Sequence, residues 1–165
     1  MMRPTLLALA LLSLGGCGLR PMYAGGSQGA VATTLRSVSV GPIEGQAGWL
    51  VRNKLIDRLG KADGGVTVYR LDVTLDDSIT AFGLRSDRAA TQERRTLRAR
   101  YQLVETRTGT VVLDATAGSD AGIDIVSSEY ATVAAEQTAL ENLSNILADQ
   151  ITARLALYAS RTPAR

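Results

Sequence analysis

Residues 66–75, VTVYRLDVTL, carry the clearest strand signal in this chain. Apolar and polar side chains alternate along this stretch, which predicts a strand with one apolar face and one polar face. The apolar face consists of Tyr69, Leu71, Val73 and Leu75, and the polar face consists of Arg70, Asp72, Thr74 and Asp76. A strand of this kind needs other elements, such as helices, to cover its apolar side.

Two later segments repeat the alternation and predict a hairpin. Residues 91–104 and residues 111–117 flank a tight turn that is predicted at Thr108-Gly109. In the first of these segments the inward residues are Leu97, Ala99, Tyr101 and Leu103, and the outward residues are Arg94, Thr96, Arg98 and Arg100. A shorter strand is predicted at residues 35–40. Residues 77–90 mix Ser, Gly, Asp and Arg, and we expect them to form an extended or mobile connection.

Two segments have the apolar spacing of helices. In residues 44–59, Trp49 and Ile56 widen the apolar stripe, and we expect Trp49 to lie in the core. Ser127 or Ser128 is the expected N-cap of a second helix, which continues to about residue 160. Its apolar stripe consists of Val133, Leu140, Leu143, Leu147, Ile151, Leu155 and Tyr158. A helix of this length would extend over roughly 45 Å.

The predicted order of elements is βαβββα. It indicates an α+β domain at residues 35–160, in which two helices pack on one face of a roughly four-stranded antiparallel or mixed sheet. The order of the strands stays open, and the opposite face of the sheet would carry the arginines. Residues 24–34 are small, polar and glycine-rich, which predicts a flexible tether before the domain. Residues 161–165 are predicted to be a C-terminal tail.

The beginning of the chain has the pattern of a secretory leader. Arg3 precedes the apolar run Leu6–Leu14, which is too short to span a bilayer but typical of a signal peptide. Residues 14–17, LGGC, then resemble the bacterial lipobox, in which the cysteine is acylated and the leader is removed. This predicts a signal peptide at residues 1–16 and lipid attachment at Cys17, with an incidental thiol as the alternative. The residue after the cysteine is Gly18 and not the aspartate that favours retention in the inner membrane. This points to the outer membrane.

The composition argues against several classes of function. Histidine is absent, which removes the commonest general base and the commonest metal ligand. Basic and acidic residues nearly balance, at 18 and 16, and aromatic residues are few, so we do not expect nucleic acid as a partner. Asp76-Asp77 is expected to end a strand rather than to bind a metal. We therefore expect no enzyme activity, no catalytic residue, no metal site and no cofactor; an anchored hydrolase is the least favoured alternative.

Three segments, in consistent order, resemble the lipopolysaccharide-assembly lipoproteins of the LptE family, in its alphaproteobacterial branch. The first is residues 17–23, CGLRPMY, which resemble the start of the mature proteins. The second contains Glu93-Arg94-Arg95 and Tyr101-Gln102-Leu103. The third lies in the last predicted helix and comprises Tyr130-Ala131, Ala135-Glu136 and residues 147–151, LADQI. Together these segments span nearly all of the chain after the leader.

The resemblance implies a two-helix, four-stranded α/β domain that is not an enzyme. Proteins of this family plug the lumen of the outer-membrane barrel LptD, assist the assembly of that barrel and help lipopolysaccharide to reach the outer leaflet. They are also held to bind lipopolysaccharide directly. The implied partners are therefore an LptD-type barrel, lipopolysaccharide and, through acyl chains on Cys17, the membrane. The implied location is the outer membrane, with the domain on the periplasmic side or within the barrel lumen.

Seven arginines fall between Arg85 and Arg107. Arg94, Arg98 and Arg100 alternate along one predicted strand, where successive residues of one face lie about 6.8 Å apart. Arg85 and Arg88 could extend this patch. Guanidinium groups bind phosphate and carboxylate bidentately, so these five arginines are candidates for contact with lipopolysaccharide or with acidic residues of a barrel. Arg95 alternates to the other face and is expected to pair with a helix or to lie at an edge.

A structural role for the same arginines is also open. Outward positions of a strand are polar in any soluble sheet, and arginine guards sheet edges against aggregation. The acidic residues that could pair with the arginines across strands are Glu93, Glu105, Asp72 and Asp76. For the whole protein, the alternative function is that of an envelope-structural or pilotin-like lipoprotein, which serves another outer-membrane or cell-wall partner.

Overall fold

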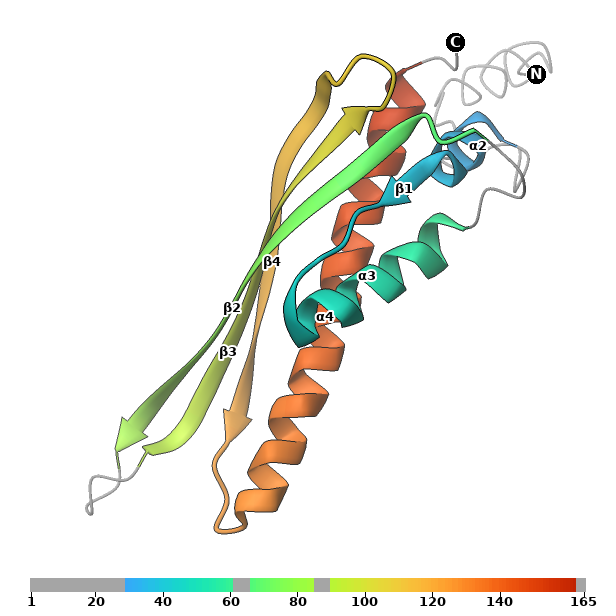
Figure 1. The fold of residues 1–165 in the computed structure, drawn as a ribbon. Coiled ribbons are helices and arrows are strands. Elements are labelled where there is room, and N and C mark those ends of the chain that lie inside the picture. The colour runs from blue at the N-terminus through green and yellow to red at the C-terminus, as the bar shows by residue number, and fades with distance from the viewer. Residues whose placement is uncertain (1–28, 61–65, 85–89, 163–165) are drawn as a thin grey trace, which may run out of the picture.

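The computed structural model of the protein describes residues 29–60, 66–84 and 90–162. Within these residues the chain forms three helices and four strands (Figure 1). They are, in chain order, α2 (Ala30–Arg36), β1 (Val38–Val40), α3 (Gly45–Leu59), β2 (Tyr69–Leu84), β3 (Ala90–Glu105), β4 (Val111–Asp124) and α4 (Glu129–Arg161). The α+β class predicted from the sequence is confirmed.

The four strands form one sheet in the order β1-β2-β3-β4. β1 runs parallel to β2, and the other two pairs are antiparallel, so the sheet is mixed. β2 and β3 pair along nearly their whole length, from Tyr69 opposite Glu105 to Leu84 opposite Ala90. Neighbouring strands in the chain are neighbours in the sheet, which is the common outcome; β1 and β2 are parallel and are joined through α3.

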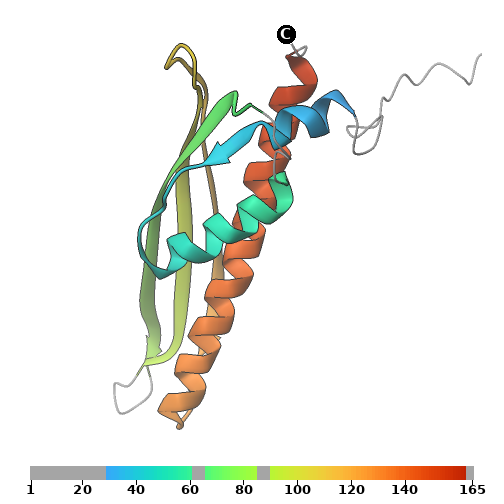
Figure 2. The ribbon, with the colours of Figure 1, turned by 45° about the vertical axis from the view of Figure 1, so that its right-hand side comes forward.

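Helices α3 and α4 cover the same face of the sheet, as predicted, and the views in Figures 1 and 2 show the opposite face without a covering helix. We call this opposite face the outer face. α4 contains 33 residues, which correspond to about 50 Å of helix. It begins at the predicted cap, where the Ser128 hydroxyl accepts a hydrogen bond from the Ala131 N–H at 3.4 Å. Glu129 in the first turn complements the helix dipole.

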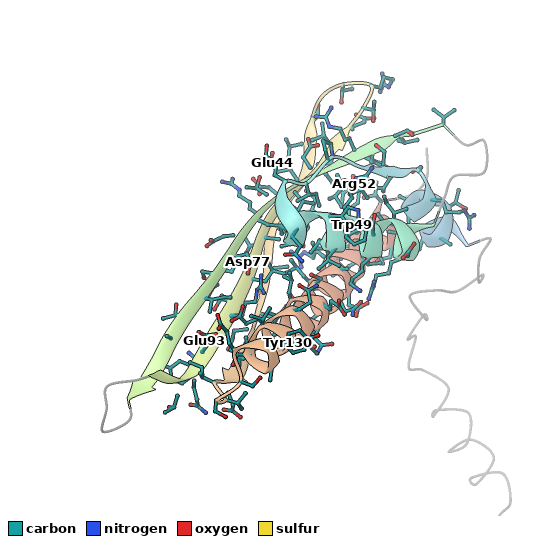
Figure 3. The ribbon with its side chains drawn as sticks, turned by 60° about the horizontal axis from the view of Figure 1, so that its bottom comes forward. Glu44, Trp49, Arg52, Asp77, Glu93 and Tyr130 are labelled. Atoms are coloured by element: carbon teal, nitrogen blue, oxygen red, sulfur yellow. The ribbon has the colours of Figure 1, made fainter. Side chains whose placement is uncertain are left out.

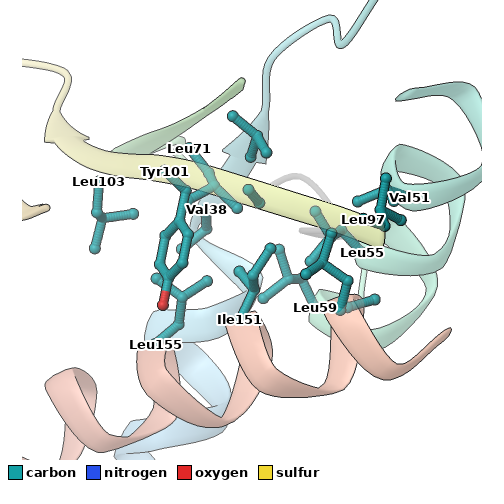
Figure 4. Close-up of a cluster of buried hydrophobic side chains, with 14 of the residues drawn as sticks. Val38, Val51, Leu55, Leu59, Leu71, Leu97, Tyr101, Leu103, Ile151 and Leu155 are labelled. Carbon is teal, nitrogen blue, oxygen red and sulfur yellow. The ribbon is translucent and has the colours of Figure 1, made fainter. Parts of the chain in front are cut away.

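The hydrophobic core fills the space between the covered face of the sheet and the helices (Figure 4). β3 contributes its four predicted inward residues, which are Leu97, Ala99, Tyr101 and Leu103. α4 contributes Leu140, Leu143, Leu147, Ile151 and Leu155, each at most 1 % exposed. Val133 departs from the predicted stripe and is 56 % exposed. It lies near the beginning of α4, beyond the region in which α3 closes the core.

Helix α2 occupies part of the segment that was expected to be a tether followed by a strand. Ala30–Arg36 is helical, and the strand β1 is limited to Val38–Val40. The Ser37 hydroxyl donates to the Thr34 carbonyl at 2.7 Å where the helix ends. Leu35 is the buried residue of α2, at 5 % exposure. The prediction was wrong here because a helix of seven residues with one buried side chain has no apolar periodicity to detect.

Strands β2 and β3 extend into the segment that was expected to be a connection. β2 continues to Leu84, and β3 begins at Ala90. Ser78 pairs with Thr96 and Thr80 pairs with Arg94 in this extension. The side chains of β2 at residues 77–83 are exposed on both faces, with Ile79 at 42 % exposure. Backbone pairing rather than burial therefore holds this part of the hairpin, and such pairing leaves a weak signal in the sequence.

Trp49 lies on the surface and not in the core, so the prediction for this residue was wrong. Its side chain is 64 % exposed, and Figure 3 shows it on α3. The residues that α3 buries are Ala47, Gly48, Val51, Leu55 and Leu59. A Cβ at Gly48 would lie 2.6 Å from the Ile43 carbonyl oxygen, so the helix turns this side toward the preceding loop. Trp49 is two positions from both Ala47 and Val51, which places it on the side of the helix away from the core.

Candidate functional site

The outer face of the sheet presents the predicted arginines to the outside. Arg94, Arg98 and Arg100 all project from β3 on this face and are exposed, as the alternation predicted. The side chains of Arg94 and Arg100 are 59 % and 69 % exposed. The outer positions of β2 at residues 70–80 and of β4 at residues 114–124 are polar or small, and Phe82, farther along β2, is an apolar exception beside Arg94.

Arg100 is held by an aspartate of the neighbouring strand. Its Nη2 and Nε donate to the two carboxylate oxygens of Asp114 at 2.9 and 3.3 Å. Gln102 Nε2 donates to the same carboxylate at 2.8 Å. The hydrogen bonds from Arg100 and then Gln102 lower the pKa of Asp114, so its carboxylate stays ionised and neutralises Arg100.

Arg94 has two weaker partners. Its Nε lies 3.8 Å from a carboxylate oxygen of Asp120, also on β4. Its guanidinium carbon lies 5.3 Å from the centroid of the Phe82 ring, at cation–π distance. Arg94 and Arg100 therefore pair with acids of β4, and not with Glu93, Glu105, Asp72 or Asp76, which the sequence had suggested. The pairing of β3 with β4 shifts by one residue between Leu103 and Val104, so counting from the turn at residues 108–109 would not have given these partners.

Arg98 makes no ion pair or hydrogen bond with any residue in the described part of the chain. Its direct neighbours across the strands are Asp76 on β2 and Gly118 on β4. Gly118 has no side chain to fill the surface, and a Cβ there would lie 3.3 Å from Arg98 Cγ. A shallow hollow of about 570 Å³ results, lined on the outer face by Thr74, Asp76, Arg98, Arg100, Thr116 and Gly118. We call it the arginine hollow.

Arg95 has the structural role that its alternation predicted. It lies on the helix-covered face, and its side chain is 12 % exposed. Its Nε and Nη2 donate to Asp77 at 2.9 and 2.6 Å, and its Nη1 donates to the backbone carbonyl of Glu136 on α4 at 3.1 Å. Arg95 thereby joins β2, β3 and α4, and it is not available to a ligand.

Glu93, labelled in Figure 3, lies on the covered face as well, and it interacts with Glu136 of α4. Its Oε2 is buried and has no hydrogen-bond partner among the described residues. Burial in the first place, and then the charge and hydrogen bonding of Glu136, raise the pKa of Glu93. Glu93 therefore holds its proton more readily than an exposed glutamate does.

In residues 29–60, 66–84 and 90–162, no group of three acidic, histidine or cysteine side chains is arranged to hold a metal ion. In the same ranges, no helix is long and apolar enough to cross a membrane. Three of the predicted site residues, Cys17, Arg85 and Arg88, lie outside the described residues, so the structure brings together Arg94, Arg98 and Arg100 only.

Comparison with known proteins points to one family. The family model LptE, described as lipopolysaccharide-assembly, matches residues 35–155, which is well over half of the chain. No curated protein sequence matches the chain at a significant level.

Solved structures share the fold. A candidate lipoprotein from Caulobacter crescentus is 24 % identical, with a TM-score of 0.68, over 81 % of this chain and 100 % of that chain. The rare lipoprotein B of Shewanella oneidensis is 11 % identical, with a TM-score of 0.58, over 75 % of this chain and 95 % of that one. A minor lipoprotein from Acinetobacter baumannii is 19 % identical, with a TM-score of 0.55, over 78 % and 95 % of the two chains. At these identities the similarity establishes the fold alone.

Proposed function

Because the chain belongs to the LptE family of lipopolysaccharide-assembly proteins, we propose that its domain plugs the lumen of an LptD-type outer-membrane barrel. There it assists the assembly of the barrel and helps to insert lipopolysaccharide into the outer leaflet. The general role in lipopolysaccharide assembly follows from the family, which is not a family of enzymes. The position in the barrel and the contact with lipopolysaccharide are the parts that we add.

The observation that carries the proposal is the uncovered outer face. The interior of a large outer-membrane barrel is polar, so a plug must present a polar surface to the barrel wall. The outer face does so over three long strands, with its charges arranged in pairs such as Arg100–Asp114 and Arg94–Asp120. These exposed pairs remain hydrated and can exchange partners with charged residues of the wall at little cost.

The arginine hollow supports direct contact with lipopolysaccharide. Arg98 is the arginine of this face that lacks a partner in the described residues, and it stands beside a depression large enough for a sugar-phosphate group. A guanidinium forms bidentate hydrogen bonds with phosphate, and the headgroup of lipopolysaccharide carries phosphate. An open sheet face meets such a headgroup without a deep pocket.

Lipid attachment at Cys17 completes the proposal. The motif at residues 14–17 and the short apolar run before it support an acylated cysteine after removal of residues 1–16. One acyl chain gives marginal binding, and two or more give stable anchoring in the membrane. The domain is then held at the periplasmic side of the outer membrane or within the barrel.

The partner is tested by purification of the tagged, lipidated protein from its own outer membrane in mild detergent, with mass spectrometry of what is retained. We expect a large barrel protein at about one copy per copy of the lipoprotein. Recovery of a secretin or of a cell-wall protein in place of a barrel would contradict the plug and favour the envelope-structural or pilotin-like alternative.

The lipopolysaccharide contact is tested by binding of purified lipopolysaccharide to charge-reversed variants. The triple variant Arg94→Glu, Arg98→Glu and Arg100→Glu should bind more weakly, and the salt dependence of binding should decrease. Arg107→Glu is the matched control, because Arg107 is 84 % exposed in the turn after β3 and away from the hollow. Equal binding by the triple variant and the control would show that the contact lies elsewhere.

A further inference from the structure

A second polar depression lies at the edge of β4, between this strand and α4. It has a volume of about 420 Å³, and the residues that line it include Tyr101, Asp114, Thr116, Gln150 and Arg154. We call it the edge groove. None of these residues was predicted from the sequence to bind a ligand.

Arg154 supplies an unpaired positive charge to the groove. Its side chain is exposed on α4, and within the described part of the chain it forms no ion pair and no hydrogen bond. The acidic residue in the lining of the groove, Asp114, is already bound by Arg100 and Gln102. The groove therefore keeps a guanidinium that its own acidic residue does not neutralise.

The hydroxyl of Tyr101 opens into the same groove. The ring of Tyr101 is buried in the core at 2 % exposure and extends from β3 toward α4, with the oxygen at its far end beside Leu155 (Figure 4). Tyr101 and Arg154 both line the groove; burial raises the pKa of the Tyr101 hydroxyl, and the charge of Arg154 acts against that rise. A buried tyrosine usually has a hydrogen-bond partner, but none of the described residues provides one here.

The backbone of β4 adds hydrogen-bonding groups. The N–H and carbonyl of Gly118 point away from β3, because both bind the side chain of Gln150. Along an antiparallel strand every second residue points the same way, so the N–H of Thr116 also faces the groove. The groove thus gathers a guanidinium, a hydroxyl and a peptide N–H, which are the donors that bind a phosphate group.

The edge groove is continuous with the arginine hollow. Thr116, Ala117 and Gln150 line both depressions. Arg98 and Arg100 therefore stand on one side of the β4 edge, and Arg154 stands on the other. A ligand that crosses this edge meets cations from β3 and from α4.

We propose that the edge groove is a second anion subsite, which binds one phosphate group of a phosphorylated sugar headgroup while Arg98 binds another. The identification of the ligand as lipopolysaccharide rests on the proposed function; the capacity to bind phosphate does not. Two subsites on the two sides of a strand edge select for headgroups with two phosphate groups over those with one.

The test measures binding of the full-length lipidated protein, in detergent, to three probes: lipopolysaccharide, lipopolysaccharide from which the phosphates have been removed, and inorganic pyrophosphate. Arg154→Gln should weaken binding of intact lipopolysaccharide about tenfold, as expected for loss of a charge-assisted hydrogen bond. Tyr101→Phe should weaken it by a smaller factor. Neither change should affect the dephosphorylated probe. Arg161→Gln, at an exposed position near the end of α4, is the matched control.

The outcomes separate this subsite from the proposed function. Unchanged binding by Arg154→Gln, together with weakened binding by Arg98→Glu, overturns the subsite and leaves the lipopolysaccharide contact standing. Unchanged binding by both variants overturns both. Loss of barrel capture by Arg154→Gln, with lipopolysaccharide binding intact, makes the groove a barrel contact and overturns the subsite. Pyrophosphate binding that Arg154→Gln abolishes, without any effect on lipopolysaccharide, supports a site for free phosphate in place of a headgroup.

Discussion

Gln150 on α4 pairs through its side-chain amide with the backbone of Gly118 on β4. The Gly118 N–H donates to Oε1 at 3.2 Å, and Nε2 donates to the Gly118 carbonyl at 3.4 Å. The outermost strand of a sheet exposes backbone groups that invite pairing with another chain. The amide of Gln150 satisfies two of these groups as a neighbouring strand would, and so fixes α4 to the sheet edge by more than apolar contact.

Replacement of this amide should loosen the edge. Gln150→Ala removes two partly exposed hydrogen bonds, and we expect it to lower the free energy of unfolding by about 1 kcal/mol. Hydrogen exchange at the Gly118 amide should accelerate, as detected by NMR or mass spectrometry. Asn142→Ala, at an exposed position of the same helix, is the control. Equal protection of Gly118 in both variants would mean that the pairing does not persist in solution.

Two adjacent residues of α4 should differ sharply in their contribution to stability. Leu147 is fully buried and Ile146 is 42 % exposed. We expect Leu147→Ala to cost about 2–5 kcal/mol, because it leaves a cavity in the core. Leu147→Asp should prevent folding, since it buries an unpaired charge. Ile146→Ala should have a much smaller effect in chemical denaturation followed by circular dichroism. Comparable losses for both alanine variants would contradict the helix orientation.

Glu93 should make stability depend on pH. Because burial and Glu136 raise its pKa in the folded state, the folded protein binds this proton more tightly than the unfolded chain does. The stabilisation is fully present below the unfolded pKa of about 4.3, and it is lost as the pH rises through the folded value. Glu93→Gln should therefore be more stable than the natural protein at pH 7, with a smaller difference at pH 4.

Melting temperatures at the two pH values, from circular dichroism, check this expectation. Glu141→Gln, at an exposed position of α4, serves as the matched control. A Glu93→Gln variant that is less stable than the natural protein at pH 7 would contradict the assigned role of the carboxyl pair.

Cys17 should decide whether the protein stays with the membrane. Cys17→Ala removes the thiol to which we assign the acyl chains, and we expect the variant to leave the membrane fraction. Fractionation with a carbonate wash, and mass spectrometry of the N-terminal peptide, measure this directly. Retention of Cys17→Ala after the wash would place the anchor elsewhere.

Much of the fold follows from the sequence because its signals are local. The alternation in residues 66–75 and 91–104 predicts strands, and the stripe from Leu140 to Leu155 predicts the long helix, since each pattern is fixed by burial of one face. The extension of β2 was missed because neither of its faces is buried there. Trp49 was misplaced because a wide apolar stripe does not show which of its margins faces the core.

The candidate site was predictable only in part. The outward direction of Arg94, Arg98 and Arg100 follows from alternation alone. Their partners on β4 depend on the register of the hairpin, and the pattern of side chains does not set that register. Arg154 comes from a helix about 50 residues later in the chain, so only the packing of α4 on the sheet brings it to the edge of the arginine hollow.

The exposed position of Trp49 has a practical consequence. It is the single tryptophan of the chain, and its indole is already largely in water in the native domain. Its emission should change little on unfolding, so tryptophan fluorescence would not detect the unfolding transition in denaturant. The same emission should shift to the blue and become shielded from quenchers when a partner covers α3. The unlabelled protein thus carries an intrinsic spectroscopic probe of its own docking.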